Sequence, residues 1–206
     1  MRRDTRRATL SKYQARTLRE YEHLLKVTGL NPDRVLQFAE DDPEAIVPTL
    51  RSMTDQAIRG DVILEYTMID MELDFILLGH FFGSDKNLRA ASRTRRYKTL
   101  QLILQNVYLM QKLSIVRTFK EVPKGIVSKI AMVNDLRNGL AHAFFISDLR
   151  ASKRIYKGHS IFTRKGLEAF HEDVQEIRYF FMPWLRRLLD EDKDEPQEHA
   201  GDFREP

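Results

Sequence analysis

Apolar residues recur at helical spacing along most of this chain, and this periodicity most constrains its fold. Between positions 62 and 80 they recur every three or four residues and form one stripe. The acidic residues beside this stripe are expected to be solvated. The stripe consists of Val62, Tyr66, Ile69, Leu73, Ile76 and His80. Such a stripe predicts an amphipathic helix that buries one face against its neighbours.

Residues that end helices divide the chain into separate segments. A first, basic helix is expected over residues 5–28, because Gly29 and Pro32 follow it, and a short helix over 33–40. A long helical segment is expected to begin at position 43 or 44 and to end at Phe82. Residues 100–117 are apolar on most sides, which predicts a helix at the centre of a bundle.

Two further stripes, in 126–145 and in 164–189, predict two more helices. Between them, residues 154–162 around Gly158 predict a short β-ribbon or an ordered loop. The expected fold is therefore all-α, an up-and-down helical bundle of four to five main helices. The expected organisation is a basic helical extension (1–57) packed on the bundle, the bundle itself (58–189) and a disordered acidic tail (190–206).

The charge of the chain is unevenly distributed. Residues 190–206 hold eight acids and two bases, whereas the remainder holds 32 bases and 22 acids, a net charge of +10. A basic body of this kind is typical either of a solvated surface or of a protein that binds a polyanion.

Several classes of protein are excluded or disfavoured. The chain has no cysteine, which excludes disulfide scaffolds, thiolate zinc sites and cysteine nucleophiles, and which fits a cytoplasmic location. No uncharged apolar run is long enough to span a membrane. The six histidines show no metal-ligand spacing, and no phosphate-binding glycine loop is present, so we expect neither a metal nor a cofactor.

Residues 134–142 read NDLRNGLAH, with Arg137 followed by the polar Asn138 and, after four intervening residues, by His142. This arrangement, late on a core helix that follows two others, resembles the signature of HEPN (higher eukaryotes and prokaryotes nucleotide-binding) domains. The resemblance covers residues 58–189. It implies a helical bundle that forms a homodimer, and a metal-independent endoribonuclease.

The resemblance assigns the chemistry to three residues. His142 would be the general acid/base, because an imidazole can take or give a proton near neutral pH. Arg137 would clamp the phosphate as negative charge develops on it, and Asn138 would orient the imidazole or the phosphate. The product would carry a 2′,3′-cyclic phosphate.

Helical geometry adds a condition to this hypothesis. Residues five apart on an ideal helix point about 140° away from each other, so Arg137 and His142 do not share a face. The two side chains can converge if Arg137 reaches around the helix, if Gly139 allows a distortion, or if a second subunit contributes.

Alternative interpretations remain. Arg137 could pair with Asp70, Asp74 or Asp135, and His142 could stabilise a helix end, so that both would be purely structural. The segment RGDVILEYTMIDMELDFILLGHFF is also similar to the mannitol-repressor family of bacterial regulators, which implies a non-catalytic transcriptional regulator or adaptor. If the chain is a nuclease, it fits the toxin of a toxin–antitoxin or phage-defence pair, with RNA as substrate and an antitoxin or regulatory protein as partner.

A basic stretch near the middle of the chain is the best candidate for contacts with nucleic acid. Its cations could bind phosphates and its tyrosine could stack on a base, although solvated loop charge would give the same pattern. The candidate residues, expected to lie in a poorly periodic connector, are Arg89, Arg93, Arg95, Arg96, Tyr97 and Lys98.

Overall fold

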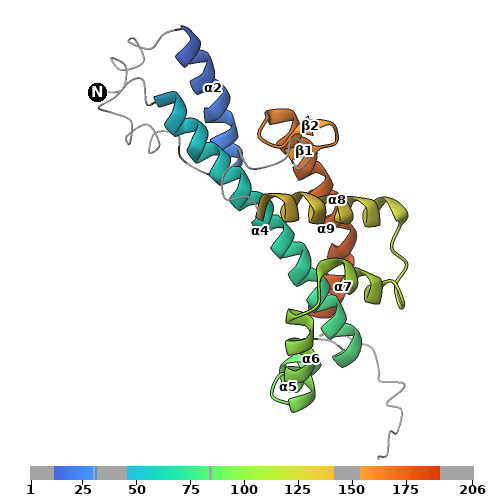
Figure 1. The fold of residues 1–206 in the computed structure, drawn as a ribbon. Helices are drawn as coiled ribbons and strands as arrows, with labels where there is room; N and C mark the ends of the chain where they lie inside the picture. Colours follow the sequence, from blue (N-terminus) through green and yellow to red (C-terminus); the bar gives the residue numbers. More distant parts are fainter. Residues whose placement is uncertain (1–11, 30, 32–45, 84, 142–153, 191–206) are drawn as a thin grey trace, which may run out of the picture. The chain divides into compact units, whose positions relative to one another are not determined.

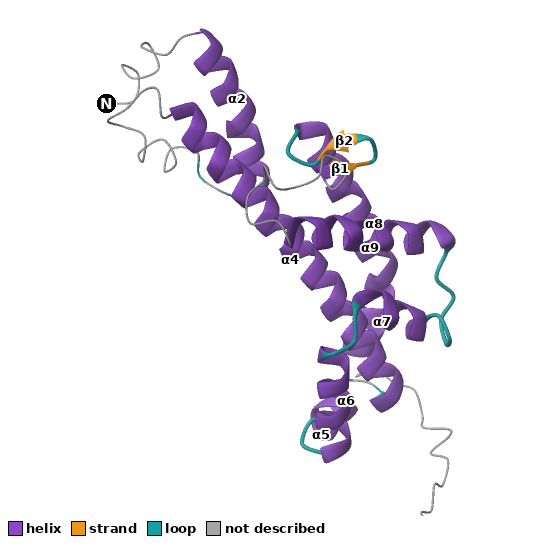
Figure 2. Ribbon diagram, in the orientation of Figure 1, coloured by secondary structure: helices purple, strands orange, loops and turns teal. Residues whose placement is uncertain are grey.

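The computed structural model describes residues 12–29, 31, 46–83, 85–141 and 154–190, and within these ranges the regular secondary structure is helical except for one small hairpin (Figures 1 and 2). The prediction of an all-α fold is confirmed. The helices are α2 (Lys12–Val27), α4 (Ile46–Phe82), α5 (Asp85–Ala91), α6 (Arg95–Gln105), α7 (Leu109–Val116), α8 (Lys124–Ala141) and α9 (Arg164–Asp190); the hairpin strands are β1 (Ile155–Tyr156) and β2 (His159–Ser160).

The chain divides into two compact units. Unit 1 comprises the described parts of Met1–Ile69 and Pro123–Ile177, and unit 2 those of Asp70–Val122 and Arg178–Pro206. The helices α4 and α9 each contribute residues to both units. The expected boundary between residues 57 and 58 lies inside α4, whereas the expected short helix over 33–40 and the acidic tail after position 190 lie outside the described residues.

Unit 1 has an apolar core built from the predicted stripes. The spacing of three and four residues puts the buried side chains of each helix on one face. The residues at 0–1% exposure include Leu24 and Leu25 of α2, Leu50, Ile58, Val62 and Ile69 of α4, Ile130, Val133 and Leu140 of α8, and Leu167, Phe170 and Ile177 of α9. The predicted helices over 126–145 and 164–189 are therefore confirmed where the structure describes them.

The hairpin in unit 1 confirms the predicted β-ribbon. Ile155 pairs with Ser160 and Tyr156 with His159. Lys157 and Gly158 form the turn, with φ of 46° and 81°, the combination that a two-residue type I′ turn requires. The hairpin lies close to the start of α9, because a Cβ on Gly166 would be only 2.0 Å from the carbonyl oxygen of Ser160. Only glycine allows this approach.

The prediction of one central helix over 100–117 is wrong, because the chain leaves helical conformation after Gln105 and starts α7 at Leu109. Asn106 ends α6, and its Nδ2 donates to the carbonyl oxygen of Leu102 at 2.8 Å. The backbone N–H of Tyr108 then donates to Oε1 of Gln111 at 3.1 Å and opens α7. These local hydrogen bonds satisfy backbone groups that a continuous helix would otherwise bond.

The expected poorly periodic connector is helical as well. It forms the end of α5 and the start of α6, separated by residues 92–94. Thr94 caps α6 by accepting the backbone N–H of Tyr97 at 3.2 Å.

Unit 2 contains an aromatic cluster around Trp184, the single tryptophan of the chain. The Trp184 ring lies 5.0 Å from the ring of Phe180 and 5.5 Å from that of Phe181, and the Lys120 ammonium lies 5.7 Å from its centroid. At the end of α4, Gly79 lies against Leu188 of α9, where a Cβ would come within 2.3 Å of the leucine side chain. None of the described helices combines the length and the apolar character that crossing a membrane requires.

Candidate functional site

The motif that resembles the HEPN signature lies at the C-terminal end of α8. Arg137 and Asn138 are half-buried near the end of this helix, and His142 lies just beyond it, outside the described residues. The predicted convergence of Arg137 and His142 therefore stays a prediction.

The guanidinium group of Arg137 is held in place by a tyrosine ring and an asparagine side chain. Its Cζ lies 4.8 Å from the centroid of the Tyr66 ring, and its Nη1 donates to Oδ1 of Asn138 at 3.1 Å. Within the described ranges, no carboxylate lies at ion-pair distance from Arg137 and no acceptor binds its buried Nε. A half-buried cation of this kind can bind an anion through donors that the protein leaves unused.

The end of α8 is anchored to α4 by a second arginine. Arg59 donates from Nη2 to the carbonyl oxygen of Leu140 at 2.9 Å. This carbonyl lies in the last turn of α8, where no backbone N–H of the helix can reach it. The bond fixes the backbone two residues before His142.

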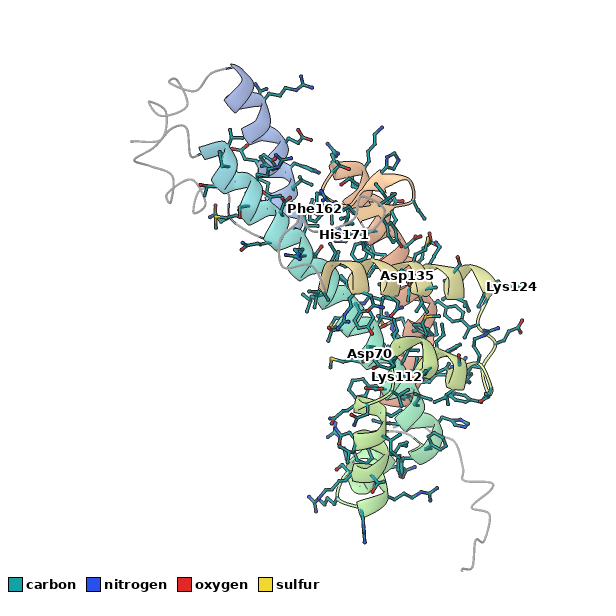
Figure 3. The ribbon with its side chains drawn as sticks, in the orientation of Figure 1. Asp70, Lys112, Lys124, Asp135, Phe162 and His171 are labelled. Carbon is teal, nitrogen blue, oxygen red and sulfur yellow. The ribbon has the colours of Figure 1, made fainter. Side chains whose placement is uncertain are left out.

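Three acids were possible ion-pair partners of Arg137 if its role is purely structural. Asp70 lies beside Lys112 (Figure 3). Asp70 and Asp74 both bind Lys112, at 2.8 and 2.7 Å, and the lysine side chain is only 1% exposed. Burial raises the pKa of Asp74, against the opposing effect of Lys112. Asp135 is exposed. Asp70 and Asp74 are thus already paired within unit 2, and no ion pair joins the described Asp135 and Arg137 within unit 1.

The acidic residues beside the α4 stripe were expected to be solvated, but two of them pair with α9. Nε2 of His171 lies 2.7 Å from Oδ2 of Asp61 within unit 1, and Glu72 accepts a hydrogen bond from Nε of Arg178 at 3.0 Å within unit 2. The hydrogen bond to Asp61 raises the pKa of His171. The sequence gives no signal for these pairs, since the partners are more than 100 positions apart.

A second polar cluster that sequence reasoning missed surrounds Asp173, which is fully buried. Its carboxylate accepts from the Tyr156 hydroxyl at 2.9 Å and from Lys157 at 2.8 Å, and Lys129 lies at 2.8 Å. Lys129 also pairs with Glu176. Burial raises the pKa of Asp173, but the hydrogen bonds outweigh it and leave the pKa below its ordinary value. All the polar partners are satisfied, so the cluster joins the hairpin, α8 and α9 and offers no free group.

The predicted nucleic-acid residues all lie within unit 2, on α5, α6 and the turn between them. The five cations, Arg89, Arg93, Arg95, Arg96 and Lys98, are exposed, and Tyr97 is half-buried. The sequence from Lys86 to Lys120 contains nine basic residues and no acid. Among the described residues, no carboxylate forms an ion pair with Arg93, Arg95, Arg96 or Lys98.

A cavity of about 520 Å³ opens beside these cations. Arg96 lies 5.9 Å from the centroid of the Phe82 ring, and the rings of Phe82 and Tyr97 are 5.3 Å apart. The residues that line the cavity come from the end of α4 and from α6: Phe81, Phe82, Arg95, Arg96, Thr99, Leu100 and Ile103. An apolar, partly aromatic cavity with two guanidinium groups at its wall suits a ligand that is both flat and anionic.

No set of three histidine or acidic side chains that could hold a metal ion occurs in the part of the chain that the structure describes. Comparisons with protein-family models, with curated protein sequences and with solved structures give no match. The HEPN resemblance thus depends on the motif itself and on the order of the helices.

Proposed function

We propose that this protein is a metal-independent endoribonuclease of the HEPN type, which acts as a homodimer in the cytoplasm and is the toxin of a toxin–antitoxin or phage-defence pair. The observation that carries the proposal is the set of contacts that the Arg137 guanidinium makes. Its guanidinium is oriented by Tyr66 and Asn138, and no carboxylate in the described ranges neutralises it. Charged side chains that are removed from water are normally paired with an opposite charge, and Arg137 has no such partner in the described ranges.

In the proposed reaction, the 2′-hydroxyl of the RNA loses its proton to a base and attacks the adjacent phosphorus. The bond from phosphorus to the 5′-oxygen breaks, and this oxygen takes up a proton. His142 takes or gives a proton in one of these steps, the role that the motif assigns to it. Arg137 donates to the phosphate oxygens, on which negative charge increases in the transition state.

The proposed dimer comes from the HEPN resemblance, and the helical geometry of the motif is compatible with it. Arg137 and His142 are five positions apart, and on one helix they point about 140° away from each other. A second copy of the chain would bring its own motif to the same phosphate, so that one subunit supplies the cation and the other the imidazole. An antitoxin or another regulatory protein would then act by blocking this site.

The test compares the wild-type protein with Arg137→Gln and with His142→Ala, both by growth after induced expression and by cleavage of RNA with the purified protein. We expect wild type to arrest growth and to leave RNA ends that carry a 2′,3′-cyclic phosphate. Each variant is expected to cut about 100-fold more slowly or worse, the usual effect of removing one transition-state donor. Arg186→Gln, which changes an exposed arginine of α9, is the charge-matched control.

Two results would contradict the proposal. One is cleavage by Arg137→Gln at the wild-type rate. The other is a folded, harmless wild-type protein that leaves RNA intact. The second result would favour the alternative function, a non-catalytic regulator or adaptor similar to the mannitol-repressor family.

A further inference from the structure

The cavity at the start of α6 combines two features that nothing in the proposed catalytic motif requires. Its wall is apolar and aromatic, and Phe81 remains 48% exposed there. Two adjacent arginines, Arg95 and Arg96, stand at the same wall and form no ion pair with a described carboxylate. Covering an exposed aromatic ring with a ligand is favourable, because it removes apolar surface from water. The Phe81 ring is therefore available for a ligand to pack against.

The charge around this cavity defines the kind of ligand. Nine basic residues and no acid occur between Lys86 and Lys120, and of the nine only Lys112 is buried against acids within the described residues. A basic stretch of this length without an acid complements a polyanion. Nucleic acid also carries flat bases, which stack on phenylalanine and tyrosine rings and on guanidinium planes.

We propose that this cavity binds single-stranded RNA by accepting one unpaired base against Phe81, while Arg95 and Arg96 bind the adjoining phosphates. A cavity of about 520 Å³ is large enough for one nucleobase with its ribose. A base in a duplex is stacked on both sides and cannot enter, so the site selects unpaired RNA. This inference rests on the proposed function, because it takes RNA as the substrate, and it specifies the class of RNA that is bound.

Binding can be measured without cleavage if every variant is made in full-length protein that also carries Arg137→Gln. Fluorescence anisotropy with a labelled 12-nucleotide single strand gives the affinity. We expect Phe81→Ala to weaken binding about 5- to 150-fold, the effect of losing one stacked base. Tyr179→Ala, which removes an aromatic ring that is 75% exposed on α9, is the matched control and is expected to change nothing.

The role of the two arginines is tested by the dependence of affinity on salt. Each phosphate contact of a single strand contributes about 0.7 to the slope of log K against log salt concentration. Arg95→Gln/Arg96→Gln should therefore lower this slope by about 1.4. Arg186→Gln/Arg187→Gln removes two exposed charges from α9 and is expected to leave the slope unchanged.

Three outcomes would overturn the inference. They are Phe81→Ala binding within twofold of the parent protein, duplex RNA of the same sequence binding as tightly as the single strand, and an acidic peptide that needs Phe81 while RNA does not. The last outcome would assign the cavity to a protein partner. If Arg137→Gln instead cuts RNA normally, the proposed catalytic site fails. The same binding comparison with a 2′-O-methyl single strand, which has no 2′-hydroxyl to attack the phosphate, then decides the cavity independently.

Discussion

Replacing Asp173 by asparagine tests whether the buried carboxylate holds the hairpin, α8 and α9 together. The substitution keeps the shape of the side chain and removes its charge, while Lys129, Lys157 and Tyr156 still point at it. Removing one partner of a buried ion pair costs about 3–5 kcal/mol. Because the amide oxygen of asparagine can still accept hydrogen bonds, we expect a loss near the lower end, about 3 kcal/mol.

Two further variants calibrate this value. Tyr156→Phe removes one hydrogen bond to a charged acceptor and leaves both lysines in place, so it should cost about 1.5 kcal/mol. Lys157→Met removes a lysine whose side chain is 40% exposed, and water screening should keep its cost below about 1 kcal/mol. The expected order of destabilisation is therefore Asp173→Asn, then Tyr156→Phe, then Lys157→Met.

Urea unfolding followed by circular dichroism measures these differences, with unchanged denaturant slopes as the check on the fold. The pKa of Asp173 is lowered in the folded protein, so its contribution is fully present above the unfolded pKa of about 3.9. It is lost as the pH falls through the folded value, and wild type and Asp173→Asn should converge in acid. A loss below 1 kcal/mol for Asp173→Asn at pH 7 would refute this reasoning.

Two other predictions concern unit 1. The pKa of His171 is raised by Asp61, so the stabilisation from this pair is complete below about pH 6.5 and is lost as the pH rises through the folded pKa. In urea unfolding, the free energy of unfolding of wild type should therefore fall by about 1 kcal/mol relative to that of His171→Gln between pH 6 and pH 9. A difference between the two proteins that stays constant over this range would contradict the assignment. Gly166→Ala places a methyl group 2.0 Å from the Ser160 oxygen and should destabilise by about 2 kcal/mol. Gly125→Ala meets nothing within 4 Å and should stabilise α8 by up to about 1 kcal/mol, so destabilisation by both changes would count against this account.

The long helices and the hairpin could be predicted because their signals are local. The apolar spacing of α4, α8 and α9 can be recognised from each segment alone, and Gly158 marks the hairpin turn by its tolerance of positive φ. The break between α6 and α7 could not be predicted in the same way. Its apolar residues continue through 100–116, and the break depends on side-chain hydrogen bonds of Asn106 and Gln111 that compete with the helix.

The residues of the candidate sites could be predicted from the sequence, but the side chains that contact them could not. The sequence identifies Arg137 and the cations of α5 and α6, but it does not show that Tyr66 lies under the guanidinium or that Phe81 lies beside Arg95. Such contacts join segments far apart in the chain, and only the packed fold decides them. The same reason explains why the pairing of Asp61 with His171 was missed.

The aromatic cluster of unit 2 makes the chain suited to an optical experiment. All tryptophan emission comes from Trp184, so this emission follows the packing of unit 2 alone. In unit 1, burial and the Asp173 carboxylate raise the pKa of Tyr156. The difference in phenolate absorbance between wild type and Tyr156→Phe will therefore follow the opening of that unit. This difference and the tryptophan emission, recorded during alkaline unfolding, will show whether the units open together or one after the other.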